Sequence, residues 1–157
     1  MICKEELMGL TGNTNEERIW NYLIGKGMSS AGAAGLMGNL YAESALNPKN
    51  LQNTSEKKLG YTDDSYTAAV DNGSYSNFVR DSAGYGLAQW TYWSRKQNML
   101  EFARAAGKSI GDLEMQLDFL FKELSEGYKT VLATLKAATT VKAASDSVLL
   151  NYERPAD

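Results

Sequence analysis

The sequence lacks histidine entirely and contains a single cysteine, Cys3, among its 157 residues. Without an imidazole, the chain cannot form the Ser-His or Cys-His pairs that activate a nucleophile, nor a zinc site that needs histidine. One thiol likewise excludes an intrachain disulfide and a cysteine cluster for a metal. Any catalysis by this chain must therefore use carboxylates, hydroxyls, lysine, tyrosine or backbone groups.

Long apolar runs and an excess of positive charge are also missing. No segment approaches the 18 consecutive apolar residues of a transmembrane helix, and the N-terminus lacks the apolar core of a secretory signal. The net charge is −3 and the basic residues are scattered, so the sequence does not predict the basic surface that nucleic-acid binding requires. Two prolines leave no linker that would split the chain. We expect a lead-in over residues 1–13 and one monomeric domain over residues 14–157.

Helical patterns dominate the N-terminal third. The segment Thr14-Asn15-Glu16-Glu17 has the form of a capping box, and apolar residues at helical spacing follow it as far as Gly25. A second helix is predicted from Ser29 or Ser30 to about Ser44. Its many glycines and alanines would weaken an isolated helix, so we expect other helices to pack closely against it.

Four further helices are predicted toward the C-terminus. The segment Ser94-Arg95-Lys96-Gln97 has the form of a second capping box, and the apolar spacing after it ends at Gly107. A longer helix is predicted from near Asp112 to Gly127, with a leucine-rich face that belongs to the core. Two shorter helices follow and end before Pro155.

The stretch between these helices, from Ala45 to Trp93, is rich in Asn, Ser, Thr, Asp, Gly and Tyr. Its short alternating pieces predict a small irregular β region, with Asp71-Asn72-Gly73 as the clearest hairpin turn. So long a stretch without a strong helix signal is usually functional. The predicted fold class is α+β and predominantly helical.

Glu43 is the most informative single position. It lies three residues after Leu40 and seven after Leu36, so on a helix its side chain shares their apolar face. Partial desolvation and the helix dipole at the last turn both raise the pKa of this carboxyl, as a general acid near neutral pH requires. Position alone leaves open a surface glutamate, solvated or paired with a basic residue.

A second cluster, Gly84-Tyr85-Gly86-Leu87-Ala88-Gln89-Trp90-Thr91, follows Asp81. Two glycines around an aromatic residue indicate special backbone conformations or a close contact. Gln89 offers paired donor and acceptor groups, which suit sugar hydroxyls and N-acetyl groups. The aromatic residues here offer flat faces for sugar rings, or are ordinary core residues: Tyr85, Trp90, Tyr92 and Trp93.

Together the two clusters carry a family resemblance. Glu43-Ser44-Ala45-Leu46-Asn47-Pro48, followed by Gly84 to Trp90, is similar to the lysozyme-like superfamily, where goose-type lysozymes and lytic transglycosylases share this pairing. The longer segments 38–44 and 84–91, with Arg95-Lys96 and a closing Tyr-Glu-Arg-Pro at 152–155, resemble the phage-tail lysozyme family more closely. The resemblance covers roughly residues 14–155 and implies a lysozyme-like fold.

The resemblance implies an N-acetylmuramidase. Protonated Glu43 would donate its proton to the β-1,4 glycosidic oxygen between N-acetylmuramic acid and N-acetylglucosamine. Asp81, just before the glycine-rich turn, is the candidate for the second carboxylate, and its rivals lie in the same polar region: Asp63, Asp64 and Asp71. A lytic transglycosylase needs no second carboxylate, because the substrate's own 6-hydroxyl closes an anhydro ring. That activity, or an inactive glycan-binding tail module, is the alternative.

The resemblance also suggests residues that contact the substrate, and these lie near the two motifs: Asn47, Tyr85, Gln89, Trp90 and Tyr92. We expect Arg95 and Lys96 to solvate a helix start, and contact with the carboxylates of peptide stems is the alternative. Ser44, without a histidine, is expected to form hydrogen bonds at the helix end rather than to act as a nucleophile.

The expected partner is the glycan of bacterial peptidoglycan, cleaved without metal or cofactor and outside the cytoplasmic membrane. Since we find no signal peptide, we expect delivery by a phage tail or particle, by holin release, or within a larger exported protein.

Overall fold

The computed structural model describes residues 9–153, and most of these residues lie in helices. The predominantly helical fold class is therefore confirmed. The chain divides into two compact units: the described residues up to Ala42 together with those from Leu120 onward, and the segment from Glu43 to Phe119. Cys3 and the last two residues of the predicted Tyr-Glu-Arg-Pro motif lie outside the described residues.

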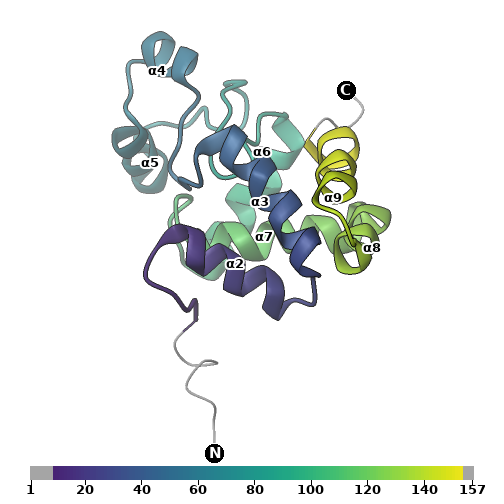
Figure 1. Ribbon diagram of the computed structural model, residues 1–157. Coiled ribbons are helices and arrows are strands. Elements are labelled where there is room, and N and C mark those ends of the chain that lie inside the picture. Colours follow the sequence, from purple (N-terminus) through teal and green to yellow (C-terminus); the bar gives the residue numbers. More distant parts are fainter. Residues whose placement is uncertain (1–8, 154–157) are drawn as a thin grey trace, which may run out of the picture. The chain divides into compact units, whose positions relative to one another are not determined.

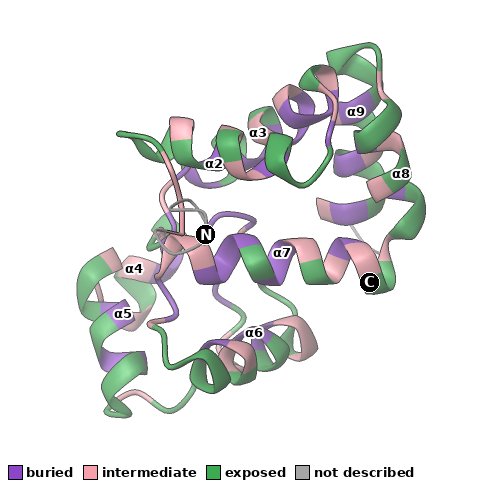
Figure 2. Ribbon diagram, turned by 90° about the horizontal axis from the view of Figure 1, so that it is seen from below, coloured by how far each residue is buried: buried purple, intermediate pink, exposed green. Residues whose placement is uncertain are grey.

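The first unit contains α2 (Asn15–Gly25), most of α3 (Ser30–Ser44), the second half of α7 (Leu113–Gly127), α8 (Lys129–Ala137), α9 (Val141–Val148) and a π-helical turn over Leu149–Glu153 (Figure 1). Thr14 caps α2 as predicted, because its hydroxyl accepts a hydrogen bond from the Glu17 N–H at 3.1 Å. The buried face of α7 is also as predicted (Figure 2), and Leu117, Leu120 and Leu124 are fully buried.

Two glycines of α3 allow close helix packing within this unit. A Cβ atom on Gly32 would lie 1.8 Å from the backbone oxygen of Leu135 in α8. A Cβ atom on Gly35 would lie 2.6 Å from the Cβ of Ala144 in α9. Both distances are shorter than real Cβ atoms allow, so the expected role of these small residues is confirmed.

Replacing Gly32 with alanine is expected to lower the free energy of unfolding by about 1–3 kcal/mol, because the new methyl group overlaps backbone that cannot give way. Gly38→Ala on the same helix is the matched control. Nothing beyond its chain neighbours and its own helix backbone lies within 4 Å of its added Cβ, so it should stabilise the protein by up to about 1 kcal/mol through helix propensity. Urea unfolding measures both, and equal effects would contradict the packing argument.

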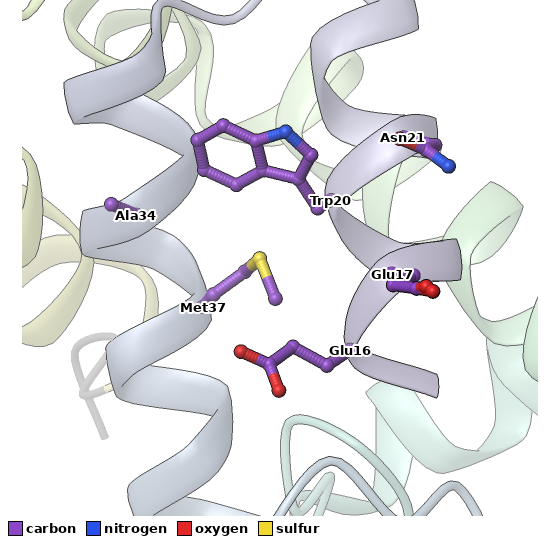
Figure 3. Close-up of a pocket in the computed structure, with 6 residues that line it drawn as sticks. All are labelled: Glu16, Glu17, Trp20, Asn21, Ala34 and Met37. Carbon is purple, nitrogen blue, oxygen red and sulfur yellow. The ribbon is translucent and has the colours of Figure 1, made fainter. Parts of the chain in front are cut away.

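A cavity of about 450 Å³ lies between α2 and α3 in the first unit. Figure 3 shows the Trp20 ring and the Glu16 carboxylate turned toward α3, where Met37 lies. The other lining residues are Glu17, Asn21 and Ala34. The cavity is mostly apolar and takes no part in the site described below.

The second unit contains α4 (Asn53–Leu59), α5 (Asp63–Asn72), α6 (Trp93–Ala106) and the first half of α7 (Figure 1). Much of the predicted β region is thus helical. Among the described residues, β pairing is limited to two isolated antiparallel bridges, Leu51–Tyr85 and Tyr85–Trp90. The hairpin predicted at residues 71–73 is wrong, because this segment ends α5.

The physical reason is a short amphipathic helix with good caps. Thr62 and Ser65 form a reciprocal capping box at the start of α5. Tyr66 and Val70, four residues apart, face the core. Gly73, with a φ of +83°, adopts the left-handed conformation that ends the helix. A glycine in a hairpin turn adopts the same conformation.

Helix α6 starts two residues before its predicted start. It begins at Trp93, and the N-cap Tyr92 makes no side-chain capping bond, so the capping box predicted at Ser94 is wrong. The helix ends as predicted, with Gly107 in the left-handed region. None of the helices in the described part of the chain is long and apolar enough to cross a membrane.

Candidate functional site

Glu43 lies in the last turn of α3, at the start of the second unit. Its side chain is exposed, whereas Leu36 and Leu40 are fully buried, so the prediction that Glu43 shares their apolar face is wrong. Partial burial nevertheless raises the pKa of the Glu43 carboxyl above its ordinary value. The direction predicted for this pKa is therefore confirmed, with desolvation as its cause.

The backbone after Glu43 turns sharply. Ala45 and Leu46 both have positive φ angles, 54° and 63°, which non-glycine residues rarely adopt. Gln89 in the glycine-rich cluster and Ser82 just before that cluster share this conformation, with φ angles of 52° and 59°. Strained backbone of this kind concentrates at functional sites because the surrounding structure must hold it.

Ser44 joins the end of α3 to the glycine-rich turn. Its side chain is buried, and its hydroxyl donates a hydrogen bond to the Leu87 carbonyl oxygen at 2.8 Å. The Asn50 amide donates to the Ser44 carbonyl at 3.1 Å. Ser44 is therefore a hydrogen-bonding residue at the helix end, as predicted, and the two motifs are in direct contact.

Gln89 and Asn50 brace the turn itself. The Gln89 amide donates to the backbone oxygens of Asn50 and Gly86 at 2.9 and 3.1 Å. The Gly86 N–H donates to the same Asn50 oxygen at 2.9 Å. A Cβ on Gly84 would lie 2.8 Å from the Gln89 Oε1, so the predicted close contact at this glycine is confirmed. Both amide hydrogens of Gln89 are thus used inside the protein.

Gln116 of α7 supports both motifs and was not predicted. It is fully buried, and its Oε1 accepts the Leu87 N–H at 2.9 Å. Its amide nitrogen donates to the backbone oxygens of Pro48 and Ile110 at 2.6 and 2.7 Å. A lone glutamine within a leucine-rich helix face gives no sequence signal for such a role, except that a buried amide needs partners.

Asp81 is enclosed rather than open to substrate. Its side chain is 1% exposed, and four donors surround the carboxylate. The Lys96 ammonium and the Ala83 N–H reach Oδ1 at 2.7 and 3.0 Å, and the Tyr66 and Tyr75 hydroxyls reach Oδ2 at 2.6 and 2.8 Å. Such a carboxylate has little capacity left to activate a water molecule.

Lys96 is wholly buried, so the expectation that it solvates a helix start is wrong. Its ammonium also donates to the Ala83 carbonyl at 2.7 Å and lies 4.3 Å from the centre of the Phe78 ring. Burial lowers the pKa of Lys96, and the hydrogen bond and charge of Asp81 act against that shift. Burial also raises the pKa of Tyr66 and Tyr75, which keeps both phenols protonated as donors.

The three rival carboxylates have different surroundings. Asp63 accepts the Leu51 N–H at 2.9 Å and the Asn47 amide at 3.3 Å. Asp71 accepts hydrogen bonds from Ser109 and from a backbone N–H. Asp64 is 87% exposed and lies 3.9 Å from the Lys49 ammonium. Asn47 thus anchors a loop through Asp63.

The aromatic residues divide into buried and exposed sets. Trp90 and Tyr85 are 1% and 0% exposed, and Trp90 packs edge-on against Phe119 at 5.5 Å. Buried rings offer no face to a sugar, so we do not retain Trp90 and Tyr85 as substrate contacts. Tyr92 and Trp93, in contrast, are 56% and 41% exposed.

Known proteins match this chain over almost all its length. Morphogenesis protein 1 of Bacillus phage B103 is 27% identical over 150 residues, covering 91% of this chain and 34% of that protein. The chain therefore spans about a third of that relative's length. Residues 14–157 match the protein family described as phage tail lysozyme, which confirms the resemblance that the two motifs carry. With nearly every residue included in that match, the chain belongs to the phage tail lysozyme family.

Proposed function

We propose that this chain is an N-acetylmuramidase that hydrolyses the β-1,4 bond between N-acetylmuramic acid and N-acetylglucosamine in peptidoglycan. The observation that carries the proposal is the bond from Ser44 to the Leu87 carbonyl, which seats the Glu43 helix end against the glycine-rich turn. Membership of a lysozyme family supports action on the cell wall. The phage relative supports delivery by a phage particle.

Glu43 acts as the general acid in this proposal. Its exposed position leaves the carboxyl accessible to a glycosidic oxygen, and its raised pKa favours the protonated form that can donate. Proton transfer to the leaving oxygen proceeds as an oxocarbenium-like centre develops on the muramic acid ring. No metal or cofactor enters the step.

Asp81 has a different role in this proposal from the one its sequence position suggests. Because four donors already occupy its carboxylate, we propose that it holds the segment before the glycine-rich turn to α6 through Lys96. Water would then add to the oxocarbenium-like carbon and lose one proton to the solvent, which completes hydrolysis.

The same enclosure of Asp81 favours a second candidate, a lytic transglycosylase, which needs only the acid. The two activities differ in their products. Hydrolysis leaves a reducing N-acetylmuramic acid, whereas transglycosylation leaves a 1,6-anhydro end that borohydride does not reduce. Incubation with purified peptidoglycan, followed by borohydride reduction and sugar analysis, tests the proposal. Reduced muramic acid supports it, and anhydro ends alone or no released fragments contradict it.

The pH dependence of cleavage follows from the raised pKa of Glu43. The acid must be protonated, so kcat/KM should fall by about tenfold per pH unit once the pH exceeds that pKa. Desolvation moves this decline to a higher pH than an ordinary glutamate would show. The NMR titration of Glu43 in the free enzyme should give the same midpoint. A rate that rises through that midpoint would mean that Glu43 acts as a base.

A further inference from the structure

Arg80, Tyr92 and Trp93 form an exposed group that the acid chemistry does not use; we call it the Arg80 surface. The rings of Tyr92 and Trp93 lie 6.2 Å apart with an angle of 37° between them. The Arg80 guanidinium lies 4.5 Å from the centre of the Trp93 ring. The three side chains therefore present a cation beside two exposed aromatic residues.

The charge of Arg80 is not neutralised by a neighbouring acid. Within residues 9–153, no carboxylate forms an ion pair with its guanidinium. The contact with the Trp93 ring is a cation–π interaction, which supplies no carboxylate partner for the guanidinium N–H donors. A planar fork of N–H donors matches the geometry of a carboxylate, so the surface is complementary to an anion.

The buried ion pair fixes the two segments that carry this surface. Arg80 immediately precedes Asp81, and Trp93 lies three residues before Lys96 on α6. The Asp81–Lys96 contact at 2.7 Å, with both side chains enclosed, ties these segments together. The Lys96 N–H also donates to the Tyr92 backbone oxygen at 3.0 Å. The backbone segments that carry the surface are thus held together before any ligand binds.

We infer that the Arg80 surface binds the peptide-bearing part of the wall glycan, with a stem carboxylate on Arg80 and apolar sugar faces against Tyr92 and Trp93. This inference rests on the proposed function, since it takes the same polymer as ligand. Peptidoglycan supplies both the sugar faces and the carboxylate, because its muramic acid residues carry a peptide that ends in a carboxylate. The surface therefore gives the enzyme a preference for strands that bear peptide stems with free carboxylates.

Binding to two matched fragments tests this inference. The Glu43→Gln variant would be titrated with a soluble disaccharide-peptide, and with the same fragment after its carboxylates have been converted to amides. We expect the free acid to bind about tenfold more tightly, as a single charge-assisted pair allows. The preference should shrink at high salt, because exposed charges are screened. Calorimetry measures the affinities, and the Trp93 indole N–H signal in NMR locates the contact.

Variants of two arginines provide the control. Arg80→Ala in the same background should bind both fragments equally, whereas Arg104→Ala, at the exposed C-terminal end of α6, should keep the preference. Arg80→Lys retains the charge but loses the planar fork of N–H donors, so it should show a partial preference. The inference would be overturned if the protein with Arg80 intact bound the two fragments equally or bound neither of them. It would also be overturned if the preference for the free acid survived in Arg80→Ala.

Measurement of turnover distinguishes failure of this inference from failure of the proposed function. If the wild-type chain releases reducing muramic acid but shows no preference between acid and amidated strands, the proposed function stands and the inference is wrong. If the chain binds the acid fragment through Arg80 but releases nothing, the muramidase proposal is wrong and the binding surface stands. Tighter binding to a phosphate-bearing wall polymer than to the peptide carboxylate would also overturn the inference.

Discussion

Glu43→Gln is expected to lower the rate of glycan cleavage by at least about 100-fold, since positioned general acids contribute about 10²–10⁴-fold. Glutamine matches the shape of glutamate but cannot donate a proton to the glycosidic oxygen. Because Glu43 is exposed, the substitution should change the free energy of unfolding by no more than about 0.5 kcal/mol. Cleavage of purified peptidoglycan and urea unfolding measure the two effects separately.

The matched control is Glu101→Gln, which changes an exposed glutamate of α6 in the same unit. It should leave both cleavage and stability unchanged. The Glu43→Gln protein should still sediment with insoluble peptidoglycan, because the glycan contacts remain. Near-normal turnover in Glu43→Gln would remove Glu43 from the chemistry, and a large loss of stability would mean that its role is structural.

Asp81→Asn is expected to lower the free energy of unfolding by about 3–5 kcal/mol, because the Lys96 ammonium would remain buried without its counter-charge. The Asp81 carboxylate also accepts hydrogen bonds from the hydroxyls of Tyr66 and Tyr75 at 2.6 and 2.8 Å, and in the variant an amide group takes its place. Urea unfolding at neutral pH measures the loss. By contrast, Asp146→Asn, which breaks an exposed ion pair with Lys142, should cost no more than about 1 kcal/mol.

The double variant Asp81→Asn with Lys96→Met distinguishes the two roles considered for Asp81. Removing both charges should recover part of the stability that the single variants lose, since no unpaired ion then remains buried. If Asp81→Asn is instead nearly as stable as the wild type but inactive, Asp81 acts directly on the substrate or on water. That outcome would restore the role that its sequence position suggested.

The chemistry-bearing motifs and most helices could be read from the sequence because local signals specify them. The capping residue Thr14, the glycines that end α2 and α6, and the leucine-rich face of α7 act through neighbouring residues. The contact between the Glu43 helix end and the glycine-rich turn was implied only by the family resemblance. The Ser44–Leu87 hydrogen bond, which spans 43 residues, supplies its structural basis.

What the sequence did not reveal depends on long-range partners. Lys96 looks like a helix-start lysine, and only the fold brings Asp81, 15 residues earlier, to within 2.7 Å of it. In the sequence Trp90 is a candidate for stacking on a sugar ring, but in the fold Phe119 packs against it. The helix α5 was missed because polar residues separate its few apolar positions, so turn propensity outweighed a short helical pattern.

Hydrolysis of glycan strands with Glu43 as the acid is the function that we propose for this chain. Mass spectrometry of fragments released in ¹⁸O-labelled water, with wild type beside Glu43→Gln, tests it most directly. The account predicts reducing N-acetylmuramic acid ends that carry one ¹⁸O atom in the wild type and none of these ends in the variant. Fragments lighter by one water and without ¹⁸O, or the same labelled ends from both proteins, would contradict it.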